Sequence, residues 1–153
     1  MTLTPKETAL LKDLKGQEKL CWEKYDKYSC DACSTELKNL FSEMAKTEKQ
    51  HYDSINQMLS GTVPQMPTGL QGENNKWCKK VQYADEQSRE IDKFLCSDML
   101  ASEKHASSLY DVSVFEFTDP AARKALNHIQ AEEQQHGEKL YAYMSQNNMY
   151  ALD

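Results

Sequence analysis

Two segments of the chain each place a glutamate and a histidine on the apolar face of a predicted helix. The first segment is AKTEKQHYDS, with Glu48 and His51, and the second is AEEQQHGEKL, with Glu133 and His136. Residues three apart in an α-helix share a face, so the two side chains of each pair point the same way. Burying an unpaired carboxylate is strongly unfavourable, so a fold that keeps these groups inside must also neutralise them.

Four long segments show helical periodicity, and no segment shows convincing strand alternation. They cover residues 5 to about 32, about 35–59, about 81–117 and about 120–147. The inward stripe of the third segment is predicted to be Ile91, Leu95, Met99, Ala106, Tyr110 and Val114. The resulting helical hairpins, residues 5–59 and 81–147, are joined by residues 60–80, which hold three of the five glycines and two of the four prolines. One long crossover between two hairpins predicts an all-α, antiparallel four-helix bundle of ferritin-like connectivity, in a single domain over residues 1–153.

The two hairpins align with each other when the chain is shifted by 85 residues. The shift superposes the charged residues of the inward stripes: Glu18 on Glu103, Glu48 on Glu133 and His51 on His136. In each hairpin the two glutamates lie about 15 residues on either side of the turn, which is roughly 22 Å along each helix. All four carboxylates are therefore expected at the same height.

Pairing the hairpins would bring four carboxylates and two imidazoles into the middle of one bundle. Since no lysine or arginine lies on the inward stripes, cations from outside must balance them. Two divalent ions carry the required charge, and this ligand pattern is the di-iron or di-manganese arrangement of four-helix bundles. The alternative, two solvated helix faces, requires the matched copies to arise by chance. The predicted ligands of the iron or manganese pair are Glu18, Glu48, His51, Glu103, Glu133 and His136.

Other titratable residues allow fewer conclusions. Tyr25 and Tyr110 lie two turns after the first glutamate of each hairpin, on the same face. Two interpretations stay open for them: core packing with a satisfied hydroxyl, or a role at the site, either hydrogen bonding to a ligand carboxylate or redox chemistry. His105 and His128 fall off the stripes and are predicted at the surface.

Composition limits the partners. The net charge of −6 offers no basic field for nucleic acid, and no apolar run is long enough to span a membrane. The N-terminal residues lack the apolar centre of a secretory signal, so we expect cytoplasmic synthesis. Cys30 and Cys33 form the one close pair among five cysteines, roughly 20 Å from the predicted metals. They can be an inert pair, a disulfide or a cross-linking handle.

The segment FEFTDPAARKALNHIQAEEQQHGEKLYAYM resembles spore coat protein F and its relatives, and the close resemblance spans residues 100–150. That family is similar to rubrerythrins and manganese catalases of the ferritin-like group. The resemblance implies the same six metal ligands and oxidoreductase activity, catalase- or peroxidase-like, on peroxide or dioxygen. Rubrerythrins carry a separate four-cysteine centre that this chain lacks, so a reductive cycle needs an outside electron donor.

The resemblance also implies a second function, from a different class. In this interpretation the chain is a structural component deposited in the spore coat, and the bundle is a scaffold without catalytic turnover. Its partners are then other spore coat proteins or further copies of the chain.

Overall fold

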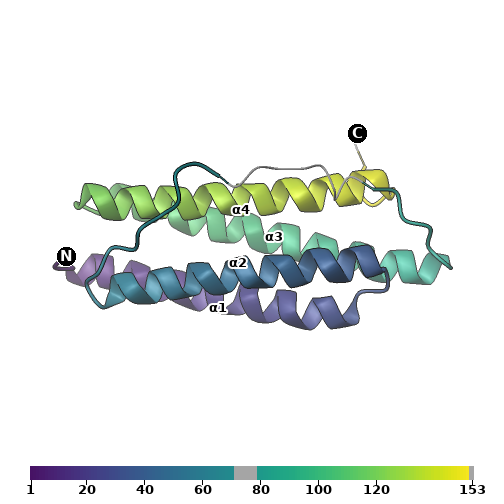
Figure 1. Ribbon diagram of the computed structural model, residues 1–153, viewed down its shortest axis with the longest axis horizontal. Coiled ribbons are helices and arrows are strands. Elements are labelled where there is room, and N and C mark those ends of the chain that lie inside the picture. The colour runs from purple at the N-terminus through teal and green to yellow at the C-terminus, as the bar shows by residue number, and fades with distance from the viewer. Residues whose placement is uncertain (71–78, 152–153) are drawn as a thin grey trace.

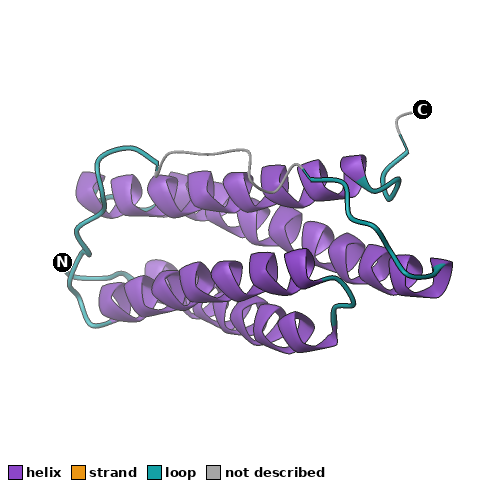
Figure 2. Cartoon of the chain, turned by 45° about the vertical axis from the view of Figure 1, so that its right-hand side comes forward, coloured by secondary structure: helices purple, strands orange, loops and turns teal. Residues whose placement is uncertain are grey.

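A computed structural model describes residues 1–70 and 79–151, and within them it contains four α-helices and no strand (Figures 1 and 2). The helices are α1 (Pro5–Asp31), α2 (Thr35–Leu59), α3 (Glu86–Glu116) and α4 (Pro120–Gln146). The prediction of an all-helical bundle is confirmed. The short turn between α1 and α2 lies at the opposite end of the bundle from the short turn between α3 and α4 (Figure 1).

Each helix begins where the sequence offers a side-chain oxygen to the free N–H groups of the first turn. The capping residues are Thr4, Ser34, Asp85 and Asp119. Thr4 forms a reciprocal capping box with Glu7, and a proline follows the cap in both α1 and α4. The capping residues therefore fix where each helix of the two hairpins begins.

The third helix begins at Glu86 and not near residue 81 as predicted. The Asp85 side chain accepts a hydrogen bond from the N–H of Ser88 at 2.7 Å, which fixes the first turn there. The residues before it are bound elsewhere, since the N–H of Val81 donates to Asn147 Oδ1 at 2.8 Å. The connection between the hairpins is accordingly longer than the predicted 60–80.

Two buried acids hold each hairpin to the turn of the other. Asp92 of α3 accepts hydrogen bonds from the N–H groups of Cys33 and Ser34, at 2.7 and 3.0 Å, in the α1–α2 turn. Glu7 of α1 accepts one from the N–H of Thr118 at 3.1 Å, in the α3–α4 turn. Because the 85-residue shift superposes these two acids, the internal symmetry extends to the ends of the bundle. The sequence pattern did not reveal this pair.

The buried position of Asp92 corrects the predicted stripe of α3. The sequence pattern predicts Ile91 on the inward stripe, but Ile91 is 41% exposed while Asp92 is fully buried. The free N–H of Cys33 in the α1–α2 turn requires a hydrogen-bond acceptor, and Asp92 supplies it. Asp92 therefore faces inward at this turn of α3, and Ile91 does not. Ile91 is left on the outer face.

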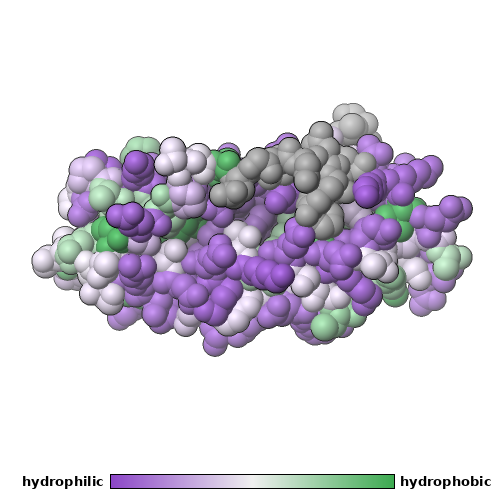
Figure 3. Space-filling view, viewed as in Figure 1, coloured by the Kyte–Doolittle hydropathy of each residue, from purple (hydrophilic) through white to green (hydrophobic). Residues whose placement is uncertain are grey.

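The buried apolar side chains form two clusters, one around Phe41 and Tyr143 and the other around Leu14 and Leu126. Hydrophilic residues dominate the face of the molecule seen in Figure 3. Among the described residues, no helix combines the length and apolar character that crossing a membrane requires.

Candidate metal centre

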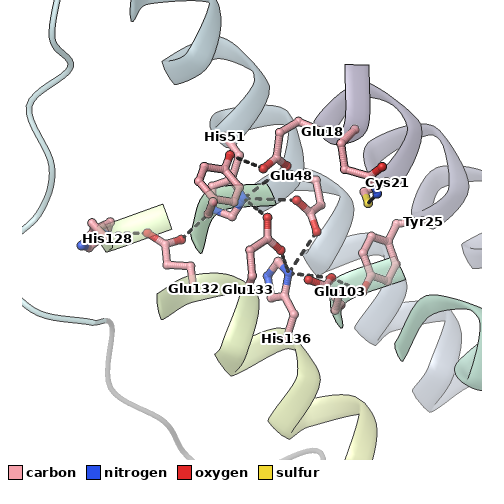
Figure 4. Close-up of polar contacts among 12 residues, drawn as sticks. Glu18, Cys21, Tyr25, Glu48, His51, Glu103, His128, Glu132, Glu133 and His136 are labelled. Atoms are coloured by element: carbon pink, nitrogen blue, oxygen red, sulfur yellow. Dashed lines mark hydrogen bonds and ion pairs between the residues drawn. The ribbon is translucent and has the colours of Figure 1, made fainter. Parts of the chain in front are cut away.

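The structure brings all six predicted ligand residues together inside the bundle (Figure 4). Each is at most 3% exposed. One glutamate comes from α1 and one from α3, while α2 and α4 each contribute a glutamate and a histidine. These residues are Glu18, Glu103, Glu48, His51, Glu133 and His136.

Both imidazoles turn Nδ1 toward the carboxylates. His51 Nδ1 lies 3.1 Å from Glu48 Oε2 and 3.2 Å from Glu133 Oε1. His136 Nδ1 lies 3.2 Å from Glu48 Oε1 and 3.1 Å from Glu103 Oε1. The two rings stack with their centroids 6.0 Å apart. The carboxylate of Glu48 thus faces one imidazole with each of its oxygens.

These side chains form two overlapping groups of four, and in each group the ligand atoms lie within 4.8 Å of one another. The first group is Glu18, Glu48, His51 and Glu133, and the second is Glu48, Glu103, Glu133 and His136. Glu48 and Glu133 belong to both. Two neighbouring ions sharing two carboxylates is the arrangement that such overlap allows.

Unpartnered carboxylate oxygens test whether the cluster fits cations. Glu18 Oε2, Glu103 Oε2 and Glu133 Oε2 are buried and accept no hydrogen bond. A buried acceptor without a partner is costly, and a cation coordinated by these oxygens would remove the cost. Carboxylate oxygen and imidazole nitrogen are donors that iron and manganese accept. The residues present therefore fit a pair of such ions.

Burial and mutual charge divide the four carboxyl groups into two kinds. Burial raises the pKa of Glu48 to about 8, and the charges of Glu103 and Glu18 add to the rise. Burial and the same charges raise the pKa of Glu133 well above its ordinary value. Burial also opposes ionisation of the other two, but the imidazoles and hydrogen bonds outweigh it. They lower the pKa of Glu103 to about 2, and the pKa of Glu18 falls below its ordinary value.

The imidazoles complete the charge balance. Burial disfavours the charged ring, yet the neighbouring carboxylates raise the pKa of His136 to about 9 and the pKa of His51 well above 6.5. When no cation is present, the raised pKa values of Glu48, Glu133 and both histidines favour bound protons, which offset the negative charges of Glu18 and Glu103. Divalent ions would displace such protons, because metal ligands must be deprotonated.

The two tyrosines hold carboxylates of the opposite hairpin. The Tyr25 hydroxyl donates to Glu103 Oε1 at 2.5 Å, and the Tyr110 hydroxyl donates to Glu18 Oε1. Burial and then the charge of the bonded glutamate raise the pKa of each tyrosine, so both stay neutral donors. Both tyrosines are also fully buried in the apolar clusters, so core packing with a satisfied hydroxyl holds as well. That the bonded glutamates are metal ligands, and a redox role for the tyrosines, stay predictions.

A second acid of α4, Glu132, lies next to His51, and the sequence pattern did not single it out (Figure 4). Glu132 Oε2 is 3.2 Å from His51 Nε2, and Glu132 Oε1 is 2.5 Å from His128 Nε2. The His128 side chain is only 11% exposed, so its predicted surface position is wrong. The overlooked signal is the four-residue spacing of His128 and Glu132, which puts them on one face. His105 is exposed as predicted.

None of the four cysteines in the described part of the chain belongs to either group. Cys21 is buried one turn from Glu18, and Gln17 Nε2 donates to its sulfur at 3.3 Å. Burial, and then the charges of nearby glutamates, raise the pKa of Cys21, which keeps the thiol protonated. Cys30 and Cys33 are exposed free thiols at the α1–α2 turn.

The fold and cluster define a class: a four-helix bundle with a buried glutamate–histidine centre. Among known families, the Coat F domain matches residues 91–153. The resemblance to spore coat protein F is therefore confirmed over that segment, which holds α4, nearly all of α3 and three of the six clustered residues. A search of curated proteins found no match, and neither did a search of solved structures.

Proposed function

We propose that this chain is a ferritin-like protein of the spore coat that binds a dinuclear iron or manganese centre. The observation that carries the proposal is the position of the two shared carboxylates. Glu48 turns one oxygen toward each histidine, and Glu133 does the same, with its Oε2 3.7 Å from His136 Nδ1. In this proposal Glu48 and Glu133 would each be ligands shared by the two ions, and His51 and His136 would each be a ligand of one ion.

Such a pair of ions supplies redox equivalents for the O–O bond of peroxide or dioxygen. The protein's own contribution is order and protection. Tyr25 and Tyr110 fix the carboxylates of Glu103 and Glu18 and keep a proton on each phenol oxygen beside the site. The apolar clusters on either side limit access of water. The site therefore favours a small oxidant over a large organic substrate.

The electron donor separates two versions of this activity. The sequence holds one Cys-x-x-Cys pair and no second pair that would complete a four-cysteine centre. Disproportionation of peroxide needs no donor and is catalase-like, whereas reduction of peroxide to water requires a donor from outside the chain. Oxygen release from peroxide with and without an added reductant distinguishes the two.

A structural role in the coat is the second candidate. The Coat F match supports it, and so do the free thiols of Cys30 and Cys33, which are exposed and available for cross-linking. In that case the ions would stabilise the bundle without turnover. A tagged copy should then locate to the coat of sporulating cells, and a uniform cytosolic signal would count against this role.

Metal content tests the main proposal. Protein purified without chelator from cells supplied with iron and manganese should carry about two ions per chain. Anomalous scattering from crystals would identify the ions and their positions. Less than about half an equivalent of the two metals together would contradict the proposal.

A further inference from the structure

The outward face of α3 carries large apolar side chains that the bundle does not bury. Phe115 is 84% exposed, Phe94 is 70%, Val112 is 56% and Ile91 is 41%. Their spacings of three, eighteen and three residues place all four on one stripe of period 3.5, as in the seam of a coiled coil. A soluble surface helix has no need of two nearly bare phenylalanines.

The first hairpin provides an internal control for this face. The 85-residue shift relates α3 to α1, and the aligned positions on α1 are Lys6, Ala9, Lys27 and Cys30. All four are exposed. Since the two helices occupy equivalent places in the bundle, the fold itself does not require apolar side chains there. We therefore infer that the apolar stripe of α3 is a surface for binding another molecule.

The order of the four residues indicates what covers them. Ile91 and Phe115 each lie twelve residues from position 103, and Phe94 and Val112 each lie nine residues from it. The stripe is thus its own mirror image about the middle of the helix. An antiparallel pair of α3 helices with a two-fold axis at position 103 would put Phe94 of one copy against Val112 of the other, and Ile91 against Phe115. Each contact would occur twice, as a two-fold interface requires.

The middle of the stripe allows the helices to approach. Ala101 and Ser108 are small and exposed, and the exposed His105 would face Ala101 of the other copy across the axis. Asp98 is turned away toward α1, where its Oδ2 accepts from the Tyr28 hydroxyl at 2.6 Å and lies 2.8 Å from Lys24 Nζ. No carboxylate of the stripe would therefore be desolvated without a partner.

The size of the face suits a reversible dimer. An aromatic side chain offers about 150–250 Å², so the two phenylalanines alone would bury roughly 250–350 Å² per copy. With Ile91, Val112 and flanking atoms, both copies together would lose on the order of 1,000–1,200 Å², the lower end for specific interfaces. We propose that two copies of this chain associate through the outward faces of α3, antiparallel and in register about position 103, with micromolar affinity.

Charge-pair complementation tests both the association and its register. Sedimentation equilibrium in reductant should find a reversible dimer for the parent protein. Phe94→Lys and Val112→Glu, each alone, should weaken self-association about 100-fold or more, because each substitution acts at both ends of the dimer. Mixing the two variants should restore the dimer, since the introduced lysine then faces the introduced glutamate while the other end keeps its native contacts.

The control is Leu20→Lys on α1, where an exposed apolar residue lies off this face, and association should be unchanged. Far-UV circular dichroism should show the same helix content for all variants, as the replaced side chains lie outside the core. A parent protein that stays monomeric at 200 µM (about 3.5 mg/ml) would overturn the proposal. So would variants that still dimerise, or a mixture that stays monomeric.

Discussion

The two hairpins agree at the buried glutamates and histidines of the cluster and differ at their outward positions. Under the 85-residue shift, both hairpins have an acid that binds the turn of the other hairpin, a tyrosine that binds a clustered glutamate, two clustered glutamates and a clustered histidine. On the outside, α3 presents apolar side chains where α1 presents polar and small ones. The inward side chains belong to one shared cluster of buried charges, so both halves need the same residue types there. The outward side chains carry no such requirement, and an outward difference is therefore particular to one half.

One inward difference breaks the symmetry of the cluster itself. His51 has Glu132 at Nε2, but the position that the shift aligns with residue 132 is occupied by Thr47. Carboxylates behind a ligating histidine orient the ring and raise its basicity. The two halves of the candidate centre therefore have the same candidate ligands, but among the described residues only His51 has a carboxylate at its Nε2.

The largest effect should come from removing what the halves share. Glu48→Gln combined with Glu133→Gln keeps the volume but removes both shared carboxylates. We expect the metal content to fall from about two ions to near zero, while the helix content stays unchanged. Metal analysis and circular dichroism measure the two outcomes. Glu138→Gln, an exposed change on α4, is the control and should keep both ions. Stoichiometric metal in the double variant would refute the ligand assignment.

A second effect follows from the protons that balance the metal-free cluster. The pKa of Glu48 is raised to about 8 and the pKa of His136 to about 9, so the native state holds more protons than the unfolded chain at neutral pH. This stabilisation is complete below the unfolded values and is lost as the pH rises through 8 and 9. In chelator, the melting temperature should fall between pH 6 and pH 9, by about 2–4 °C per kcal/mol lost.

Metal should reverse that trend, because cations compete with the same protons. With excess manganese the melting temperature should hold or rise as the pH increases. In chelator, the Glu48→Gln, Glu133→Gln double variant should show a shallower fall than the parent, since neither glutamine can ionise. A parent protein whose metal-free form is more stable at pH 9 than at pH 6 would contradict the charge balance.

Periodicity and internal repetition together were enough to predict the bundle and its clustered residues. The helical period predicts which side chains face inward, and equal numbers of residues from a turn predict that they lie at the same height in the bundle. These two rules need no knowledge of contacts between the hairpins. The roles of Asp92 and Glu132 could not be predicted in this way. Asp92 faces inward to serve the backbone of another hairpin, and Glu132 reaches a histidine 81 residues away, so both depend on how the hairpins dock.

The smallest effect should arise at the asymmetric position. Glu132→Gln keeps a hydrogen-bond partner near His51 but removes the carboxylate charge. We expect one of the two ions to bind about 10-fold more weakly and the other to be unaffected, since second-layer carboxylates alter metal affinity by about 10–100-fold. Stepwise manganese titration, followed by calorimetry, would resolve the two affinities. Equal weakening of both ions would show that Glu132 supports the cluster as a whole and not the His51 side.

The reciprocal change would sharpen the same comparison. Thr47→Glu places an acid where the internal symmetry puts one behind His136. If the absence of a carboxylate behind His136 explains why one ion binds more weakly, Thr47→Glu should increase the affinity for that ion by a few-fold. The two affinities should then become similar. Combined with Glu132→Gln, Thr47→Glu should exchange which ion binds more tightly. If neither Glu132→Gln nor Thr47→Glu changes the two metal affinities, any difference between the two ions must come from the ligands themselves. The contact of Glu132 with His51 would then contribute only to packing.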